Sequence, residues 1–531
     1  MDLNHTALWL AGLLAASLFW SSLRAPHRPL GWLGVTALVV LVALLGNFAL
    51  PALAGYAAGA LALLLILLPM WIHGAASRAG NRFRYRRARH LYGIAAALHP
   101  FDGWPAKPRL MQAFELAHSG KPHEAEAQLQ RLASGDGQVA IMAQAHRLRI
   151  MGNWSELRAL AERRGLSALG RDPTLLVLYL RALGELNEVD HLAEFMRAQE
   201  QTLLGSGAFD AGLLYLFAFS GQVDLTRQAL AHAREPYTEE TRKLWLALAR
   251  ERAGDSLQAR QEFEALRRAD DPQIRRLAAR HADDLLYPQP VMAPSLRVLQ
   301  IVAHFARLAG QRRDLVPGAR GHRPERFVVV LLIAINALVY LFGSRPGFFD
   351  TSNAFIEAWS FNADKIVNGG EWRRLLSYLF VHANAIHFAM NMLGLWALGP
   401  FVERAFGRVR FVLVYLAAGC VGSSVYLLIY LFNGRYSGRP SEDLVGASGC
   451  IMGLLGATAA VMLRAWIVQR ASVARQLFFR LLVVVALQVA FDLSTPQVAG
   501  LAHAIGLLAG FLTALALRER VSAKQSIASL S

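Results

Sequence analysis

The chain has 531 residues, of which 54% are hydrophobic, and it carries a formal net charge of +17. This length allows two to four domains, and such a composition indicates apolar membrane segments that alternate with basic soluble parts. The two cysteines, Cys420 and Cys450, lie in apolar segments without metal-ligand spacing. They argue against a disulfide framework and against a cysteine-based metal site.

Three apolar runs open the chain, at about 7–23, 31–50 and 53–73. Each approaches the length that a helix needs to cross a bilayer, and Pro51 separates the second run from the third. The opening letters MDLNHT lack the positive region of a secretory signal, so we expect the first run to remain as a membrane helix. Because that run is short, two spans is the alternative. Residues 1–75 are expected to form N-terminal membrane helices.

A basic juxtamembrane segment, residues 76–94, follows these runs and contains RFRYRRAR from Arg82 to Arg89. Beside a membrane helix, such a run favours anionic lipid at the cytoplasmic surface. Nucleic acid is the less favoured alternative, and we expect no nucleic-acid partner. Membrane lipids are therefore an expected partner of this segment.

Residues 95–300 are soluble in composition and helical in period, and they contain a repeat. Five similar phrases open on glycines spaced 32, 32, 37 and 33 residues apart: Gly120, Gly152, Gly184, Gly221 and Gly254. A helix-turn-helix unit of this size resembles a tetratricopeptide-like solenoid, although the consensus aromatics and proline are mostly absent. An irregular helical domain is the alternative. Such solenoids present a concave surface to partners, so a protein partner is expected here.

A basic linker is predicted at residues 301–325, and six further apolar segments follow it. These lie near 326–343, 384–402, 409–432, 444–463, 475–491 and 497–517. Arginines precede the first segment, separate the second from the third and the fourth from the fifth, and follow the sixth, which places all four groups in the cytoplasm. With three N-terminal spans the repeats face the cytoplasm too, so nine spans are predicted. Residues 518–531 form a C-terminal tail.

Ser448 and His503 are polar residues within the fourth and sixth of these segments. Their surroundings, GASGCIMG and AHAIGLLAG, contain small-residue pairs that let two helices approach closely: Gly449 with Gly453, and Gly506 with Gly510. A serine nucleophile needs a base within hydrogen-bond reach, and an imidazole titrates near neutral pH. Both segments run inward, so we expect the two residues at matching depth, about four and six residues into their helices. Purely structural roles are the alternative.

The acidic residue nearest to His503 in this part of the sequence is Asp492, eleven residues earlier. We expect Asp492 in the loop before the sixth segment, where it would not orient the imidazole. A Ser-His dyad is therefore predicted instead of a triad.

A second polar group is the stretch His382-ANAI-His387-FAM-Asn391. His387 and Asn391 are four residues apart and so share one face of a helix. With the backbone N–H of Ser448 they would supply three donors to a tetrahedral oxyanion. Helix–helix hydrogen bonding is the alternative. A zinc site is the other competitor, but there is no H-E-x-x-H motif and no carboxylate at ligand spacing. We expect no metal and no cofactor.

Taken together, these motifs resemble those of the rhomboid family of intramembrane serine proteases. The family's G-x-S-G is GASG here, with Gly446 and Gly449, and its A-H-x-x-G-x-x-x-G is AHAIGLLAG, with Gly506. Its H-x(4)-H-x(3)-N is the stretch from His382 to Asn391. The GEWRRL stretch at 370–375 and the connection that begins at Glu403 are also similar. The resemblance covers about 326–517, some 36% of the chain.

The resemblance implies an all-α fold in which a six-helix rhomboid-like bundle joins the N-terminal membrane helices and the repeat domain. It also implies roles for individual residues. Ser448 would be the nucleophile and His503 the general base, and the oxyanion donors would be His387, Asn391 and the Ser448 amide. Arg374 would shape the loop in the outer leaflet.

Two departures from the family pattern stand beside these residues. Met452 occupies a position where an aromatic often stacks on the histidine, and Arg373 stands where a second Trp is common. We expect altered tuning from Met452 instead of loss of activity. Ala447, and not proline, precedes the serine, which favours an active enzyme.

The implied function is cleavage of single-span or polytopic membrane proteins near the outer leaflet. A non-proteolytic adaptor that binds client helices and recruits partners through the repeats is the alternative, and a transporter fits the span count but not the paired glycines. The Ala-, Leu- and Arg-rich composition indicates a bacterial inner membrane, with the active residues on the periplasmic side and the repeats in the cytoplasm.

Overall fold

The computed structural model describes residues 3–24, 29–135, 137–165, 169, 172–233, 237–286, 293–315, 326–344, 350–434, 443–469, 472–495, 500–517 and 519. The chain divides into two compact units. One is Asn4–Ala309, and the other combines Gly310–Ser531 with Met1–Leu3. Within the described part, the secondary structure is helical apart from three isolated β-bridges. Seven described helical stretches are long and apolar enough to cross a membrane. The chain is an all-α, multi-pass membrane protein.

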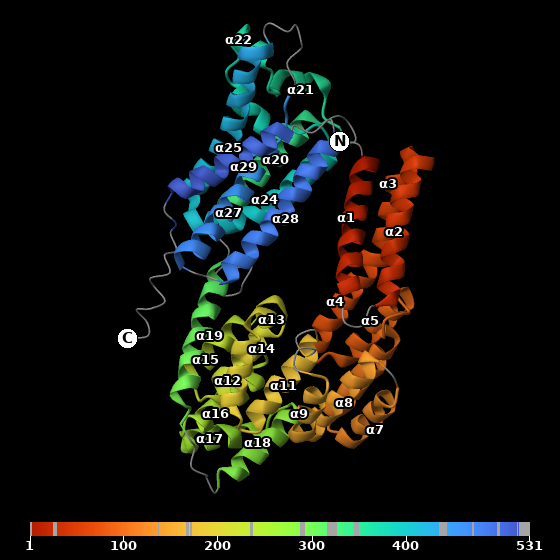
Figure 1. The fold of residues 1–531 in the computed structure, drawn as a ribbon, viewed down its shortest axis with the longest axis vertical. Coiled ribbons are helices and arrows are strands. Elements are labelled where there is room, and N and C mark those ends of the chain that lie inside the picture. The colour runs from red at the N-terminus through yellow and green to blue at the C-terminus, as the bar shows by residue number, and fades with distance from the viewer. Residues whose placement is uncertain are drawn as a thin grey trace. The chain divides into compact units, whose positions relative to one another are not determined.

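The three N-terminal apolar runs form helices, as predicted (Figure 1). They are α1 (Leu3–Arg24), α2 (Leu30–Ala49) and a rod made of α3 (Pro51–Ala62), a π-helical turn (Leu63–Leu67) and α4 (Leu68–Asn81). Pro69 has no N–H to donate inside this rod, and a π-turn is one way for a helix to absorb such a defect. Small buried residues on α1 and α3, among them Ala11 and Ala58, let these helices pack closely.

The first soluble helix, α5 (Tyr85–Leu98), packs along α4, and the loop after it holds the start of α2. The Asp102 carboxylate accepts hydrogen bonds from the backbone N–H groups of Gly31 (3.1 Å) and Trp32 (2.9 Å). These groups belong to the first turn of α2, whose N–H groups have no partner within the helix. The cap therefore fastens the soluble helices to a membrane helix of the same unit.

The repeat region consists of paired helices. They are α6 (Lys107–His118), α7 (Pro122–Ala133), α8 (Gln138–Met151), α9 (Trp154–Arg163), α11 (Pro173–Glu185), α12 (Val189–Ala198), α13 (Glu200–Gly205), α14 (Phe209–Phe219), α15 (Val223–His232), α16 (Glu239–Arg252), α17 (Ser256–Leu266) and α18 (Pro272–Asp284). Four of the five predicted turn glycines adopt positive φ: Gly120, Gly152, Gly221 and Gly254.

The prediction that Gly184 opens a repeat at the turn between two helices is wrong. Gly184 lies inside α11, where a Cβ would approach the ring of Phe219 to 2.0 Å. Asn187 takes the left-handed turn position instead, with φ of 61°. Asparagine tolerates this conformation better than most residues, so the turn lies three residues later than predicted and needs no glycine.

The linker predicted at 301–325 is also wrong over its first part, because α19 (Leu296–Leu315) covers it. Val298, Val302 and Phe305 are buried on one face of α19, at the i, i+4, i+7 spacing of a helix that packs on a core. His304 on the same helix contacts Glu200 at 2.8 Å. Residues 316–325 lie outside the described residues.

The C-terminal unit contains the six predicted apolar segments as helices (Figure 1). They are α20 (Phe327–Gly343), α24 (Ala385–Phe406), α25 (Arg408–Ile429, followed by a π-helical turn, Tyr430–Gly434), α27 (Ser448–Gln469), α28 (Ser472–Ser494) and α29 (Gly500–Ala516). Between α20 and α24 lie the short helices α21 (Asn353–Trp359), α22 (Ala363–Val367) and α23 (Arg374–Ser377) and a 3-10 turn (Tyr378–Phe380). At 17 residues, α20 and α29 are short for a span.

Glycines set the distance between α27 and α29. A Cβ on Gly506 would come within 2.3 Å of the Gly449 carbonyl oxygen, and a Cβ on Gly510 within 2.1 Å of the Gly453 oxygen. Gly456, which the sequence motifs did not single out, is equally close to Leu507. Since real Cβ atoms do not approach this closely, the backbones touch only because these positions carry no side chain.

A first prediction concerns the stability of the repeat region. Burial, and then the charge of Arg149, lowers the pKa of His146 to about 3. In the unfolded chain this histidine has its ordinary pKa of about 6.5, so the unfolded state binds the proton first. The stabilising contribution of neutral His146 is complete above that pH and is lost as the pH falls from about 6.5 toward 3.

We therefore expect the unfolding midpoint of the full-length chain in detergent to fall less between pH 7.5 and pH 5 in His146→Gln than in the wild type. His123, which is 86% exposed, supplies the matched control. Equal falls in wild type, His146→Gln and His123→Gln would contradict this assignment.

Candidate active site

Three helices begin at the same end of the bundle and bring the predicted residues together. Gly446 lies beside His387, while Gly394 packs on Ile451, so α24 and α27 run in the same direction. The paired glycines of α27 and α29 show that these two helices are also parallel. The candidate site therefore lies where three helix N-termini meet.

Ser448 is the first residue of α27, and His503 is the fourth residue of α29. The expected depths of about four and six residues are thus too large, because residues 444–447 do not join the helix. Leu444 forms an isolated β-bridge with Phe361, and Gly446 adopts φ of 113°. The backbone N–H of Ser448 belongs to the first turn, where helical N–H groups have no partner within the helix.

Gly446 brings the start of α27 against α24. A Cβ at this position would lie 2.6 Å from Nε2 of His387 and 3.4 Å from Nδ2 of Asn391. The Gly446 N–H donates to the Tyr378 carbonyl oxygen at 2.9 Å. The two polar side chains of α24 therefore converge on the backbone two residues before Ser448.

Asn391 is buried, and its Nδ2 has no hydrogen-bond partner among the described residues. An unpaired buried amide donor lowers the stability of the folded state by about 1–3 kcal/mol, so an unpaired Asn391 needs an explanation. On the same helix His387 lies one turn earlier, and its backbone N–H is capped by the Asn384 side chain at 2.9 Å. Both side chains can donate toward the same point if Nε2 of His387 carries its proton.

His382 lies three residues before the start of α24. It is buried, its Nδ1 is 3.3 Å from the Phe380 carbonyl oxygen, and its ring stands edge-on to His387 with centroids 5.2 Å apart. This contact makes His382 a support for the His387 ring.

His503 is held by a carboxylate that we predicted to be in a loop. Asp492 lies in the last turn of α28, and its Oδ2 is 2.9 Å from Nδ1 of His503. The side chains are only 7% and 9% exposed, respectively. The expectation that no acidic residue can orient His503 is therefore wrong. The sequence signal that could have revealed this contact was an acidic residue at the end of an apolar segment. It was misread because α28 extends three residues beyond the predicted end of that segment, and Asp492 lies in these residues.

The structure places Ser448 and His503 on touching stretches of backbone. The Ala502 carbonyl oxygen, beside His503, is 3.7 Å from the Cβ position of Gly449, beside Ser448. A methyl group at that position would be in ordinary van der Waals contact with this oxygen, so the two backbone stretches lie side by side. Met452 is buried one turn after Ser448.

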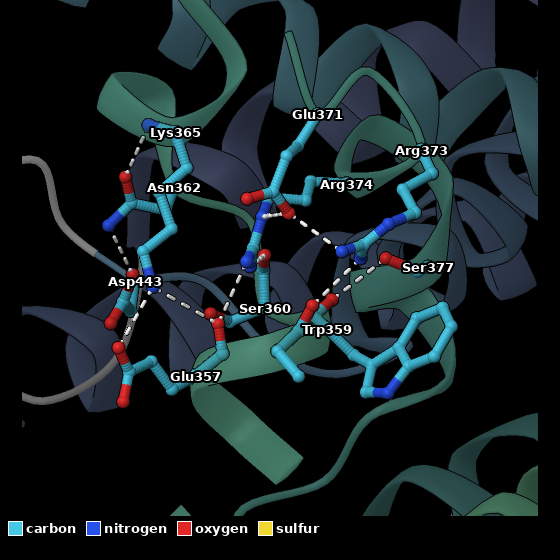
Figure 2. A network of polar contacts seen from close by, with 11 residues as sticks. Glu357, Trp359, Ser360, Asn362, Lys365, Glu371, Arg373, Arg374, Ser377 and Asp443 are labelled. Atoms are coloured by element: carbon cyan, nitrogen blue, oxygen red, sulfur yellow. Dashed lines mark hydrogen bonds and ion pairs between the residues drawn. The ribbon is translucent and has the colours of Figure 1, made fainter. Parts of the chain in front are cut away.

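Arg374 organises the loop before α24 (Figure 2). Its side chain is 2% exposed. Nε donates to Glu371 at 2.9 Å, Nη1 to the Ser360 carbonyl oxygen at 2.8 Å, and Nη2 to the Glu357 carbonyl oxygen at 2.9 Å. Arg373 shares the Glu371 carboxylate at 2.7 Å and lies over the Trp359 ring. Arg374 therefore joins the end of α21 to the turn that precedes α23.

Among the described residues, no group of three or more His, Cys, Asp and Glu gathers in a way that could hold a metal ion. The site consists of a hydroxyl, imidazoles, an amide and backbone donors. This set suits acyl transfer, in which a nucleophile, a base and oxyanion donors must meet.

Comparison with known proteins agrees with this geometry. Residues 369–520 match the family model of the Rhomboid domain. This part of the chain is a rhomboid domain. The matched range contains Ser448, His503, His387, Asn391 and Asp492.

Proteins named as rhomboid proteases or rhomboid-like proteins are similar to about a third of this chain. Rhomboid protease GluP of Bacillus subtilis is 33% identical over 187 residues, which are 35% of this chain and 34% of GluP. Putative rhomboid protease YdcA of the same bacterium is 28% identical over 191 residues, 35% of this chain and 85% of YdcA. RHOMBOID-like protein 6, mitochondrial, of Arabidopsis thaliana is 35% identical over 147 residues, 28% of this chain and 44% of that protein. The chain thus spans about a third of GluP and under half of the plant relative.

The glycine at 446 yields a second prediction. Gly446→Ala should lower cleavage of a model membrane substrate at least about tenfold, because the new methyl group would push His387 and Asn391 away from Ser448. Gly370 is the matched control. It also has positive φ, but nothing lies within 4 Å of its Cβ position. Gly370→Ala tests backbone strain alone, and equal losses in both variants would rule out the crowding explanation.

A third prediction follows from the Arg374 network. Arg374→Ala leaves several buried acceptors without a donor and should lower the free energy of unfolding by roughly 3 kcal/mol or more. The neighbouring side chain of Arg373 is 48% exposed, and Arg373→Ala should cost about 1 kcal/mol or less. Denaturant unfolding of the full chain in detergent measures both. A reversed order would refute the organising role of Arg374.

Proposed function

We propose that the rhomboid domain is a serine endopeptidase that cleaves membrane-spanning segments of other proteins. The observation that carries this proposal is the unpaired, buried Nδ2 of Asn391, which with Nε2 of His387 faces the backbone just before Ser448. A donor kept unpaired at this position suits an oxyanion that exists only during the reaction.

In the proposed reaction, Oγ of Ser448 attacks the carbonyl carbon of the substrate while Nε2 of His503 takes its proton. The carbonyl oxygen becomes an oxyanion, which accepts hydrogen bonds from the Ser448 amide, Asn391 and His387. The carbon–nitrogen bond then breaks, and His503 returns the proton to the leaving amine. Water attacks the resulting acyl-enzyme with His503 again as base, which releases the second product and restores Ser448.

The electrostatics of the bundle favour this chemistry. Each helix N-terminus carries a partial positive charge, and α24, α27 and α29 all present this end to the site. The three partial charges add to the hydrogen-bond donors in stabilising the oxyanion. A low local dielectric at the buried site strengthens the effect.

We further propose that the site faces the outer side of a bacterial inner membrane. Ser448, His387 and His503 occupy the first turns of their helices, whereas Arg404 lies in the last turn of α24 and Arg464 in the last two turns of α27. Basic residues favour the cytoplasmic end, so the site would be at the other end. A substrate helix would have to unwind there, because a helical peptide bond is shielded from attack. Single-span and polytopic proteins are both possible substrates.

The test is cleavage of a single-span model substrate by the full-length protein in liposomes. Ser448→Ala should reduce the rate at least about 10³-fold while the unfolding midpoint stays near that of the wild type. Labelling by a serine-reactive fluorophosphonate should disappear in both Ser448→Ala and His503→Ala.

Ser344→Ala is the matched control, since Ser344 is a partly exposed serine directly after α20 whose hydroxyl donates only to the Leu341 carbonyl oxygen in the described contacts. This variant should cleave the model substrate, and be labelled by the fluorophosphonate, as fast as the wild type. Unchanged cleavage by Ser448→Ala would exclude Ser448 as the nucleophile. A wild type that neither cleaves the substrate nor is labelled would favour the adaptor, in which the bundle only binds client helices.

A further inference from the structure

The contact between Asp492 and His503 joins two helices through buried side chains. Oδ2 of Asp492 lies 2.9 Å from Nδ1 of His503, and Oδ1 accepts a hydrogen bond from Nε2 of Gln488 at 2.8 Å. The Cβ of Asp492 also lies 3.1 Å from the Cβ position of Gly500, at the start of α29. Both carboxylate oxygens are thus engaged, and the carboxylate has a fixed orientation.

This contact determines which ring nitrogen of His503 carries the proton. A carboxylate only accepts hydrogen bonds, so the nitrogen that faces it must be the donor. Nδ1 is then protonated in the neutral ring, and Nε2 keeps a free lone pair. A general base that takes a proton from a serine needs this tautomer.

The helix that supplies Asp492 is only lightly held by the bundle. No residue is buried in the most apolar 18-residue stretch of α28, and Leu482, Val483 and Leu487 are exposed. Near the start of α28, Phe478 packs against Trp466 with ring centroids 5.9 Å apart. At the other end, Asp492 accepts a hydrogen bond from His503 on α29.

We propose that Asp492 is the positioning residue that makes His503 a base, so that the catalytic base is assembled from α28 and α29 together. Asp492 holds Nδ1–H and keeps Nε2 free for the Ser448 proton, and it does not itself take a proton. This inference rests on the proposed protease function. It makes the dyad dependent on the docked position of α28, because a displaced α28 would leave the imidazole without a fixed tautomer.

Asp492→Asn provides the test in full-length protein reconstituted in liposomes. The amide nearly matches the carboxylate in shape, but its NH2 group would donate to Nδ1 and move the ring proton to Nε2. We expect kcat to fall by about 10²- to 10⁴-fold, with KM within about twofold of the wild type. The rate of fluorophosphonate labelling at Ser448 should fall with kcat.

Two further variants separate positioning from structure. Asp492→Glu restores a carboxylate and should recover at least about tenfold of the lost kcat. Asp364→Asn is the matched control, because it makes the same chemical change at an exposed carboxylate on α22 that only accepts from Asn368 and Tyr430 in the described contacts. Its kcat should equal that of the wild type.

The outcomes are distinguishable. If Asp492→Asn keeps its kcat within about threefold while Ser448→Ala is inactive, the positioning role is wrong and the protease stands. A parallel loss of kcat, KM and unfolding midpoint in Asp492→Asn, without recovery in Asp492→Glu, would show a merely structural role and overturn the inference. Cleavage that survives in Ser448→Ala would instead remove the protease itself.

Discussion

Backbone contact between α27 and α29 is the constraint on which the site depends. Lipid tails are as apolar as leucine, so membrane helices associate through close packing and polar contacts instead of the hydrophobic effect. Gly506 and Gly510 lie against the carbonyl groups of Gly449 and Gly453. Even one methyl group at Gly506 would force the helices apart, and the stretches that carry Ser448 and His503 would lose their contact.

The polar groups around this contact fall into two classes. Arg374 and Asp492 have their hydrogen-bonding groups engaged, and they hold a loop and an imidazole in place. Nδ2 of Asn391 is a buried donor that has no partner among the described residues. Satisfied polar groups give rigidity, whereas unpaired donors store electrostatic free energy that a developing negative charge can release. The proposed protease would use both classes, the first to hold its geometry and the second to stabilise the oxyanion.

Much of the architecture could be predicted from the sequence because its signals are local. Apolar length identified the membrane helices, and paired glycines identified the α27–α29 contact. The spacing of His387 and Asn391 placed both on one face of α24. Each of these inferences needs only the period of a helix and the chemistry of the residues on it.

The errors concern boundaries and tertiary contacts. Asp492 was predicted in a loop, but α28 ends at Ser494, and three residues of helix decide whether this carboxylate reaches His503. Ser448 begins its helix because Gly446 turns with a positive φ that periodicity does not report. The basic residues of α19 interrupt its apolar spacing in the sequence. The sequence therefore predicts a linker there, and the packing of Phe305 near Phe209 of α14 was not expected. Tertiary partners decided each case.

The rod from Pro51 to Asn81 has a consequence for whatever the helical repeats bind. Its 31 residues extend about 45 Å as a helix, which exceeds the roughly 30 Å of the hydrocarbon core. A rod that stands along the bilayer normal would therefore extend beyond the hydrocarbon core, and α5 packs on α4 at one end of this rod while Asp102 caps the start of α2. If the repeat region binds a protein, these contacts would hold that protein at a fixed height above the headgroups, whereas a flexible linker would let it sample many heights.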